Sequence, residues 1–151
     1  MDRRTLLKFG IAFSLLPKVA SATNREVWSA PRTAEKLEQN AIKLIDVRSR
    51  QEWLETGVAK GAWPISLHEP NFQNRLFLAR ELSAGSPIAL ICATGGRSGR
   101  ILKALKQAGY TGFIDVSEGM LGSYLGPGWI ARGLPLTDLN TAITALPMAL
   151  R

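Results

Sequence analysis

The stretch "PIALICATGGRSGRILKALKQAG", residues 87–109, contains the pattern from which the fold is predicted. Its first six residues are almost entirely apolar and end in Cys92, the only cysteine of the chain. A short apolar run of this kind is typical of a strand buried on both faces of a parallel sheet. From Ser98 onward the apolar residues recur at helical spacing, which predicts an amphipathic helix with Gly109 at its C-cap.

The same alternation of strand and helix continues on both sides of this unit. Further strands are predicted at 42–47, 62–67 and 112–119, and helices at 31–40, 49–57 and 71–85. Residues 26–28 could add an edge strand. Alternating elements of this kind predict an α/β fold, in which a mostly parallel sheet is covered by helices on both faces.

The predicted helix at 49–57 has clear start and stop signals. Ser49 is a plausible N-cap, and Glu52 stands three residues later, in the position of a capping box. Gly57 is expected to end the helix. A last short helix is predicted in "TDLNTAITAL", residues 137–146, which we expect to pack on the sheet or on a partner.

The N-terminal segment has the layout of a secretory signal. Arg3 and Arg4 precede a short apolar run at 9–16, which Pro17 ends, and residues 20–22 fit a small-x-small cleavage site. "DRRTLLK" also resembles the twin-arginine export motif. We therefore expect a signal peptide at 1–22, a domain at 23–136 and a C-terminal helix or tail at 137–151, in a periplasmic or secreted protein exported by that machinery. The alternatives are an uncleaved membrane anchor and an amphipathic helix.

The composition argues against several classes of function. The formal net charge of +7 suggests a nucleic-acid partner, but residues 1–22 contain four of the 19 basic residues and one of the 12 acidic ones. Their removal leaves 15 basic against 11 acidic residues, a net charge of +4. The sequence also has no stripe of arginine and aromatic residues of the kind that binds nucleic acid. One cysteine excludes an internal disulfide, and with one histidine a zinc site of the usual ligands is not expected.

The residues after Cys92 point to a reactive thiolate. In open α/β sheets, ligands bind at the carboxyl ends of the strands, where Cys92 is expected. Gly95 and Gly96 allow the loop to turn its amides inward, and the following helix adds its positive end. Such a site favours the thiolate, and Arg97 adds positive charge for an anionic substrate. The alternative is that Cys92 is a small buried hydrophobic residue.

Three motifs, in this order, resemble those of the rhodanese family. "CATGGRS", residues 92–98, resembles its active-site loop, Cys-x-x-Gly-x-Arg-Ser. "LIDVRSRQEWLETGVAKGA", residues 44–62, resembles its upstream signature, and "SEG" followed by "GWIARGLPL", residues 117–119 and 128–136, resembles its C-terminal signature. The resemblance covers about residues 27–136. It implies a three-layer α/β/α sandwich around a mostly parallel five-stranded sheet.

The resemblance also implies a sulfurtransferase. Cys92 would take a sulfane sulfur from a small anionic donor such as thiosulfate and hold it as a persulfide. A thiol, including a protein thiol, or a cyanide-like acceptor would then remove it, without a metal or an organic cofactor. The substrate-binding residues would be those of the loop: Ala93, Thr94, Gly95, Gly96, Arg97 and Ser98.

Two other functions remain open. The first is a non-catalytic sulfur carrier or docking module of the same fold, which Ala93 favours because many rhodaneses have arginine at that position. The second is a phosphatase or arsenate reductase, but the spacing from Cys92 to Arg97 is Cys-x4-Arg, whereas the phosphatases have Cys-x5-Arg. Val58 and Ala59 replace the usual His-Ile, and residues 121–128 resemble an insertion that could border the pocket.

Several polar residues are interpreted structurally. Asp46 and Arg48, at a strand end, are expected to form a supporting ion pair rather than to act in catalysis. Arg97 could pair with Asp46 or Glu118 instead of the substrate. His68 is expected to be a loop residue rather than a base.

Overall fold

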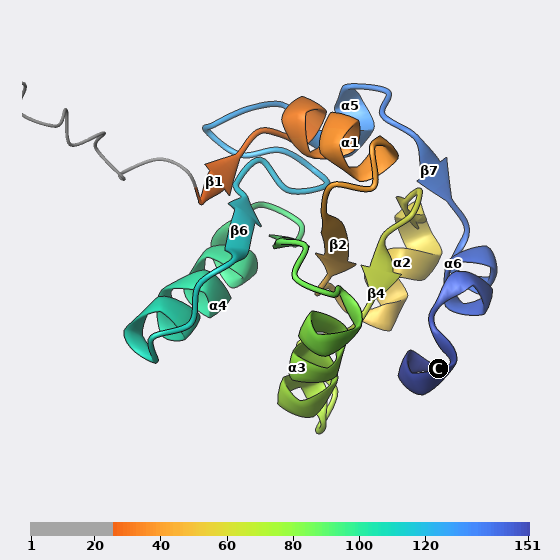
Figure 1. Ribbon diagram of the computed structural model, residues 1–151. Coiled ribbons are helices and arrows are strands. Elements are labelled where there is room, and N and C mark those ends of the chain that lie inside the picture. Colours follow the sequence, from red (N-terminus) through yellow and green to blue (C-terminus); the bar gives the residue numbers. More distant parts are fainter. Residues whose placement is uncertain (1–25) are drawn as a thin grey trace, which may run out of the picture.

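The computed structural model describes residues 26–151; the predicted signal peptide lies outside this range and is not tested by it. The centre of the fold is a five-stranded parallel sheet with the order β1-β6-β5-β2-β4 (Figure 1). Its strands are β1 (Val27–Trp28), β2 (Lys43–Asp46), β4 (Trp63–Pro64), β5 (Ile88–Ile91) and β6 (Phe113–Val116). The strand predicted at 87–92 therefore lies in the middle of the sheet, with β2 and β6 as its neighbours.

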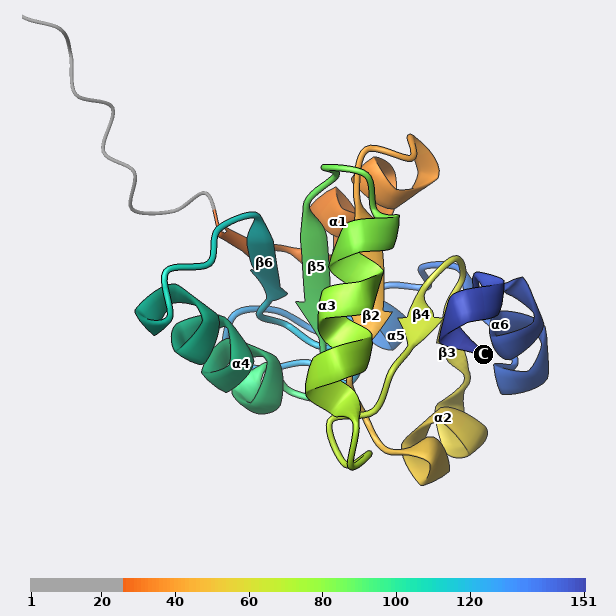
Figure 2. The ribbon, with the colours of Figure 1, turned by 60° about the horizontal axis from the view of Figure 1, so that its bottom comes forward.

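Helices cover both faces of this sheet. α3 (Phe72–Leu82) and α4 (Gly96–Gln107) pack on one face, and α1 (Ala30–Glu38) and α5 (Gly128–Ala131) pack on the other (Figure 2). α2 (Arg50–Thr56) and α6 (Leu139–Ala145) form a smaller cluster with a two-stranded antiparallel sheet of β3 (Val58–Ala59) and β7 (Leu136–Thr137). The predicted three-layer α/β fold is confirmed.

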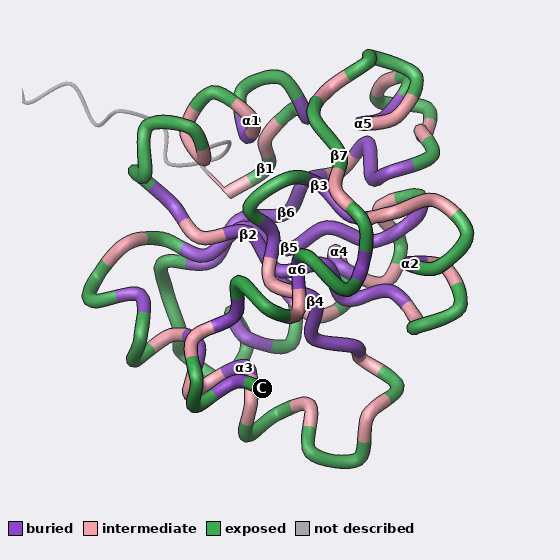
Figure 3. The backbone as a smooth tube through the Cα atoms, turned by 90° about the vertical axis from the view of Figure 1, so that its right-hand side faces the viewer, coloured by how far each residue is buried: buried purple, intermediate pink, exposed green. Residues whose placement is uncertain are grey.

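Alternating residues of the central strands supply the two halves of the core. On β5, Ile88 and Leu90 pack toward α3 and α4, whereas Ala89 and Ile91 pack toward α1 and α5. All four are at most 1% exposed, so the strand is buried on both faces, as its apolar sequence predicts (Figure 3). The chain end also joins this core, because Leu150 of the final 3-10 turn (η1, Met148–Leu150) packs in the same cluster as α3.

Most local signals are confirmed at the positions where they were expected. Ser49 caps α2, and the reciprocal hydrogen bonds with Glu52 complete the capping box. The helix predicted at 137–146 is present as α6. One detail of α4 was wrong: its C-cap is Ala108, and Gly109 follows at a φ of +84°. β3 and β7 were missed, because two residues are too few to show alternation.

Asp46 and Arg48 form a fully buried ion pair at the end of β2. The Arg48 guanidinium donates to the Asp46 carboxylate, with 2.8 Å between Nη2 and Oδ2, and neither side chain is exposed. Arg48 also donates to the Thr56 hydroxyl and to the carbonyl of Gly57. The pair therefore fastens the end of α2 to the end of β2, which agrees with the structural interpretation of these two residues.

Replacing Asp46 with asparagine should destabilise the fold strongly, because it leaves the Arg48 charge buried without a counterion. Removing one partner of a buried ion pair costs about 3–5 kcal/mol, so we expect a loss of that size in the free energy of unfolding. Urea unfolding followed by circular dichroism measures it. Glu35→Gln is the control, since Glu35 pairs with Lys36 on the surface and should change little. Equal stability of the two variants would contradict the prediction.

Candidate active site

Cys92 follows the last residue of β5 and directly precedes the turn into α4. Its side chain is 1% exposed. The amides of Gly95 and Ser98 donate to Sγ, at 3.1 Å and 3.5 Å, and the Ser98 hydroxyl oxygen lies 3.4 Å from the same sulfur. The sulfur is thus held over the N-terminus of a twelve-residue helix, where donors and the helix dipole both favour a negative charge.

The turn depends on Gly95. Its φ is +86°, in the left-handed region, and a Cβ there would lie 2.3 Å from the carbonyl oxygen of Ser117. The turn after β6 makes the reciprocal approach, since a Cβ on Gly119 would lie 2.3 Å from the carbonyl oxygen of Ala93. Gly96 differs from both, because a Cβ on it would have no heavy atom within 4 Å and its φ is not positive. Of the two adjacent loop glycines, Gly95 is therefore required, whereas Gly96 leaves room for a side chain.

Two hydrogen bonds fix the relative position of these turns. The amide of Met120 donates to the carbonyl of Cys92, and the amide of Leu121 donates to the carbonyl of Ala93, both at 2.8 Å. The backbone on which the sulfur is mounted is thereby tied to the segment after β6. Reactive geometry at Cys92 consequently depends on both turns.

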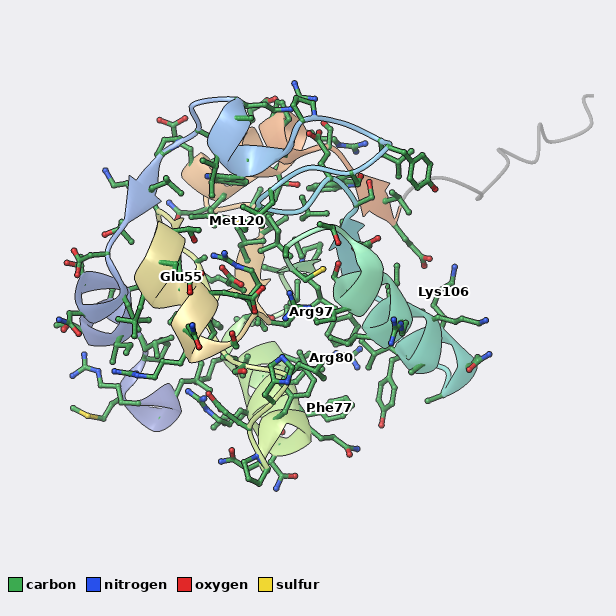
Figure 4. All side chains as sticks on the ribbon, turned by 180° about the vertical axis from the view of Figure 1, so that it is seen from behind. Glu55, Phe77, Arg80, Arg97, Lys106 and Met120 are labelled. Carbon is green, nitrogen blue, oxygen red and sulfur yellow. The ribbon has the colours of Figure 1, made fainter. Side chains whose placement is uncertain are left out.

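Arg97 pairs with Glu52 of α2. Nη2 lies 2.6 Å from Oε1 and Nη1 lies 2.9 Å from Oε2, which is a two-point contact, and His68 Nε2 lies 3.4 Å from Nη1. Figure 4 shows Arg97 among the side chains between α2 and α4. The suggestion that Arg97 pairs with Asp46 or Glu118 was wrong, because those carboxylates are engaged by Arg48 and Arg132 respectively.

This ion pair shifts the titration of both partners. The hydrogen bond from Arg97 is the main cause that lowers the pKa of Glu52, to about 2, with further help from the amide and hydroxyl of Ser49. Glu52 raises the pKa of Arg97, and a smaller effect in the same direction comes from Cys92. Arg97 is therefore a permanent cation, oriented by α2, whose field reaches the sulfur.

The other loop residues differ in exposure. Thr94 and Gly96 are exposed, Ala93 is buried, and Ser98 is fully buried beneath the sulfur. The structure thus brings Cys92 together with the loop residues selected from the sequence, with Arg97 turned toward α2. Within residues 26–151, no three His, Cys, Asp or Glu side chains are grouped closely enough to hold a metal ion. No helix of that range is both long and apolar enough to cross a membrane.

Glu118 organises the segment that follows Gly119. Its buried carboxylate accepts hydrogen bonds from the amides of Ala30 and Gly128 and forms an ion pair with Arg132. Burial alone would raise the pKa of Glu118, but these donors outweigh it and lower the pKa. The loop at 121–128 is therefore anchored at both ends, while Tyr124, at its tip, is 96% exposed.

Sequence reasoning missed the second role of Glu52. Its place in the capping box is readable from the Ser49–Glu52 spacing, but its contact with Arg97 spans 45 residues. The available signal was the position of α2 after a parallel strand next to β5, since the carboxyl ends of neighbouring parallel strands meet at one edge of the sheet. Gly119 was also missed, because a close backbone approach leaves no periodic pattern in the sequence.

The chain belongs to the rhodanese-like domain family, whose sequence model matches residues 29–123. The fold and the cysteine loop described above are those that the family resemblance implied. The spans predicted for the signal peptide, the domain and the C-terminal segment stay predictions.

Three known proteins illustrate the relationship. An uncharacterized protein of Synechocystis sp. is 29% identical over 126 residues, which are 82% of this chain; the chain spans 63% of that relative's length. The rhodanese-like domain of an Anabaena sp. protein has a TM-score of 0.52 at 19% identity, covering 81% of this chain and 84% of its own. The polysulfide-sulfur transferase homodimer of Wolinella succinogenes has a TM-score of 0.53 at 24% identity, covering 74% and 77%. Both structures show a shared fold.

The two glycines of the loop should respond differently to alanine. Gly95→Ala places a side chain at positive φ and against the Ser117 carbonyl, and the left-handed backbone alone costs about 1–2 kcal/mol. We expect lower stability in urea and slower alkylation of Cys92 by iodoacetamide. Gly96→Ala is the matched control and should keep both properties. Loss of stability in Gly96→Ala, or a Gly95→Ala variant like the wild type, would contradict this account of the turn.

Proposed function

We propose that this protein is a sulfurtransferase that carries a sulfane sulfur on Cys92. The observation behind the proposal is the placement of Cys92 Sγ, which accepts hydrogen bonds from the Gly95 and Ser98 amides at the start of α4. These donors stabilise a thiolate before the reaction and would equally stabilise the negative charge of a persulfide. The sulfurtransferase named among the structures of similar fold supports the same function.

The proposed cycle has two displacement steps. The Cys92 thiolate attacks the outer sulfur of a donor such as thiosulfate; the S–S bond of the donor breaks, and sulfite leaves with the electron pair. The enzyme then holds Cys92–S–S⁻. A thiolate acceptor, or cyanide, attacks the terminal sulfur, and the Cys92 thiolate is released. Neither step needs a general base, a metal or an organic cofactor.

Arg97 would attract and orient the anionic donor in this cycle. Its guanidinium is already fixed by Glu52, so no side-chain freedom is lost when a donor binds nearby. The same contact neutralises part of its charge, and Ala93 provides no second cation in the loop. Thiosulfate affinity is therefore expected to be modest, and a polysulfide is a second donor to test, since a polysulfide-sulfur transferase has a similar fold.

The main alternative is a sulfur carrier or docking module of the same fold that does not catalyse turnover of a sulfur donor. The fold alone does not separate the two, whereas the amides directed at Cys92 Sγ favour chemistry at the sulfur. A phosphatase is less well supported, because the four residues between Cys92 and Arg97 form a shorter loop than the phosphatases use to surround a tetrahedral phosphate.

Persulfide formation tests the function directly. Incubation with thiosulfate or polysulfide should add one sulfur atom, about 32 Da, to the intact mass, and a thiol or cyanide should remove it. Cys92→Ser should gain nothing. Because Cys92 is the only cysteine, any gained sulfur is assigned without peptide mapping. An unchanged mass with every donor would reject the enzyme in favour of the docking module.

We further propose that the protein works outside the cytoplasm after removal of residues 1–22. We infer this from the paired Arg3 and Arg4, the apolar run behind them and the small residues before Thr23. A single thiol suits an oxidising compartment, since it cannot form an internal disulfide there. The twin-arginine route would deliver the chain with its Cys92 loop already folded.

Cell fractionation with a C-terminal tag tests the proposed location. The mature protein should appear in the periplasm with its N-terminus near Thr23, and replacing Arg3 and Arg4 with lysine should block export. A cytoplasmic product that retains Met1, unaffected by these replacements, would reject both the compartment and the route.

A further inference from the structure

The loop at 121–128 places apolar side chains at the surface beside the cysteine loop. Tyr124 is 96% exposed, and Leu121 and Leu125 are more than half exposed. The loop is joined to the site at its first residue, because the Leu121 amide donates to the Ala93 carbonyl. Three exposed apolar side chains on one short loop form a patch rather than scattered surface residues, and such a patch marks an interaction surface.

Hydrogen bonds hold the tip of this loop in one shape. Ser123 and Gly126 exchange two backbone hydrogen bonds, at 2.9 Å and 3.2 Å. Tyr124 and Leu125 are thus the two-residue turn of a short hairpin. The Ser123 hydroxyl also donates to the Ser117 carbonyl and accepts from the Leu125 amide. The apolar side chains are therefore presented on a fixed backbone, and burying them against a partner does not require a loop to be ordered first.

The part of the chain that contains this tip exposes positive charge only. Between Glu81 and Asp138 the sequence has two acidic residues, Asp115 and Glu118, and both are buried. The same segment has five basic residues, of which four lie on α4. A partner that complements this segment is therefore anionic.

One face of α4 extends toward the strand from which the tip emerges. A Cβ on Gly99 would lie 3.6 Å from Oδ2 of Asp115, on β6. Lys106, further along the helix, pairs with Glu26, the residue before β1 (Figure 4). Positions 99, 103 and 106 share one helix face, so the exposed Lys103 lies on the side of α4 that faces β6 and β1.

We propose that the tip of the 121–128 loop and the Lys103 side of α4 dock this protein on an anionic membrane surface. The tip is convex, whereas small ligands bind in concave pockets, and a protein partner would need a recess of matching shape. A bilayer interface accepts a narrow apolar tip without such a recess. Tyr124 suits this position, because its ring is apolar while its hydroxyl stays hydrated. Lys103 would then lie near the lipid phosphates.

The point at which the chain enters the fold supports the same orientation. The apolar run at 9–16 is joined to Glu26 by residues 17–25, a connection that spans at most about 30 Å when fully extended. Because Glu26 pairs with Lys106, the precursor would bring this face close to the membrane that receives its apolar run. Docking would then keep the mature protein there, with Cys92 near the bilayer. This orientation rests on the proposed export, whereas the charged face and its tip do not.

Vesicle sedimentation with the purified protein tests the proposal. The wild type should bind phosphatidylcholine vesicles that contain about one quarter phosphatidylglycerol at about 0.1 M salt, and about 0.5 M salt should release it. Pure phosphatidylcholine should bind much less. Replacing both Tyr124 and Leu125 with serine should lower the partition coefficient about tenfold or more, because two apolar side chains leave the interface. Met148→Ser, at an apolar position of η1 that is 78% exposed, is the control and should change little.

A second pair of variants tests the role of charge. Lys103→Glu should lower the partition coefficient about tenfold, because it reverses a charge at the lipid surface. Lys60→Glu changes the net charge equally, but Lys60 is exposed beside β3, on the side of the molecule away from α4, and its variant should lose clearly less (Figure 2). Residues that remain of the N-terminal segment are common to all variants and cannot produce these differences.

Three results would overturn the proposal: no binding of the wild type to the anionic vesicles, equal binding to neutral ones, or equal losses in the variants and their controls. The exposed tip would then be left for a protein partner. The variant with serine at 124 and 125 should still gain one sulfur atom from a donor at the wild-type rate. Failure of the wild type to form a persulfide would reject the proposed function and leave the vesicle result standing.

Discussion

The site depends on the contact between two turns that have no room for side chains. The turn after β5 and the turn after β6 approach so closely that Gly95 and Gly119 each face a carbonyl oxygen of the other turn. The Met120 and Leu121 amides then complete the contact with hydrogen bonds to Cys92 and Ala93. Because both turns are fixed, the amides at the start of α4 are held pointing toward the sulfur of Cys92. Preorganised donors of this kind need no rearrangement when charge develops on the sulfur.

The electrostatics of the site follow from how its charged side chains are paired. Arg48 forms an ion pair with Asp46, and Arg97 forms one with Glu52. Neither guanidinium therefore pairs with the sulfur of Cys92. What remains closest to Cys92 is a set of dipoles from amides and one hydroxyl. Glu52 joins two functions in one carboxylate, since it caps α2 and also orients Arg97. The helix after β2 is in this way part of the site, although it contributes no group to the sulfur itself.

The fold could be predicted from the sequence because apolar strands, capping residues and glycines act locally. The strand at 88–91, the Ser49–Glu52 capping box and the helix near the C-terminus all follow from patterns within about ten residues. The position of Cys92 at a strand end was predictable for the same reason. The partner of Arg97 was not, because it requires knowing which strands are neighbours.

The burial of Cys92 also selects reaction partners by their shape. Because Cys92 is 1% exposed, a narrow group such as a terminal sulfur atom reaches its sulfur more easily than a bulky group does. Steric access to the only thiol of the chain is thus a second basis, besides its reactivity, on which reaction partners are selected.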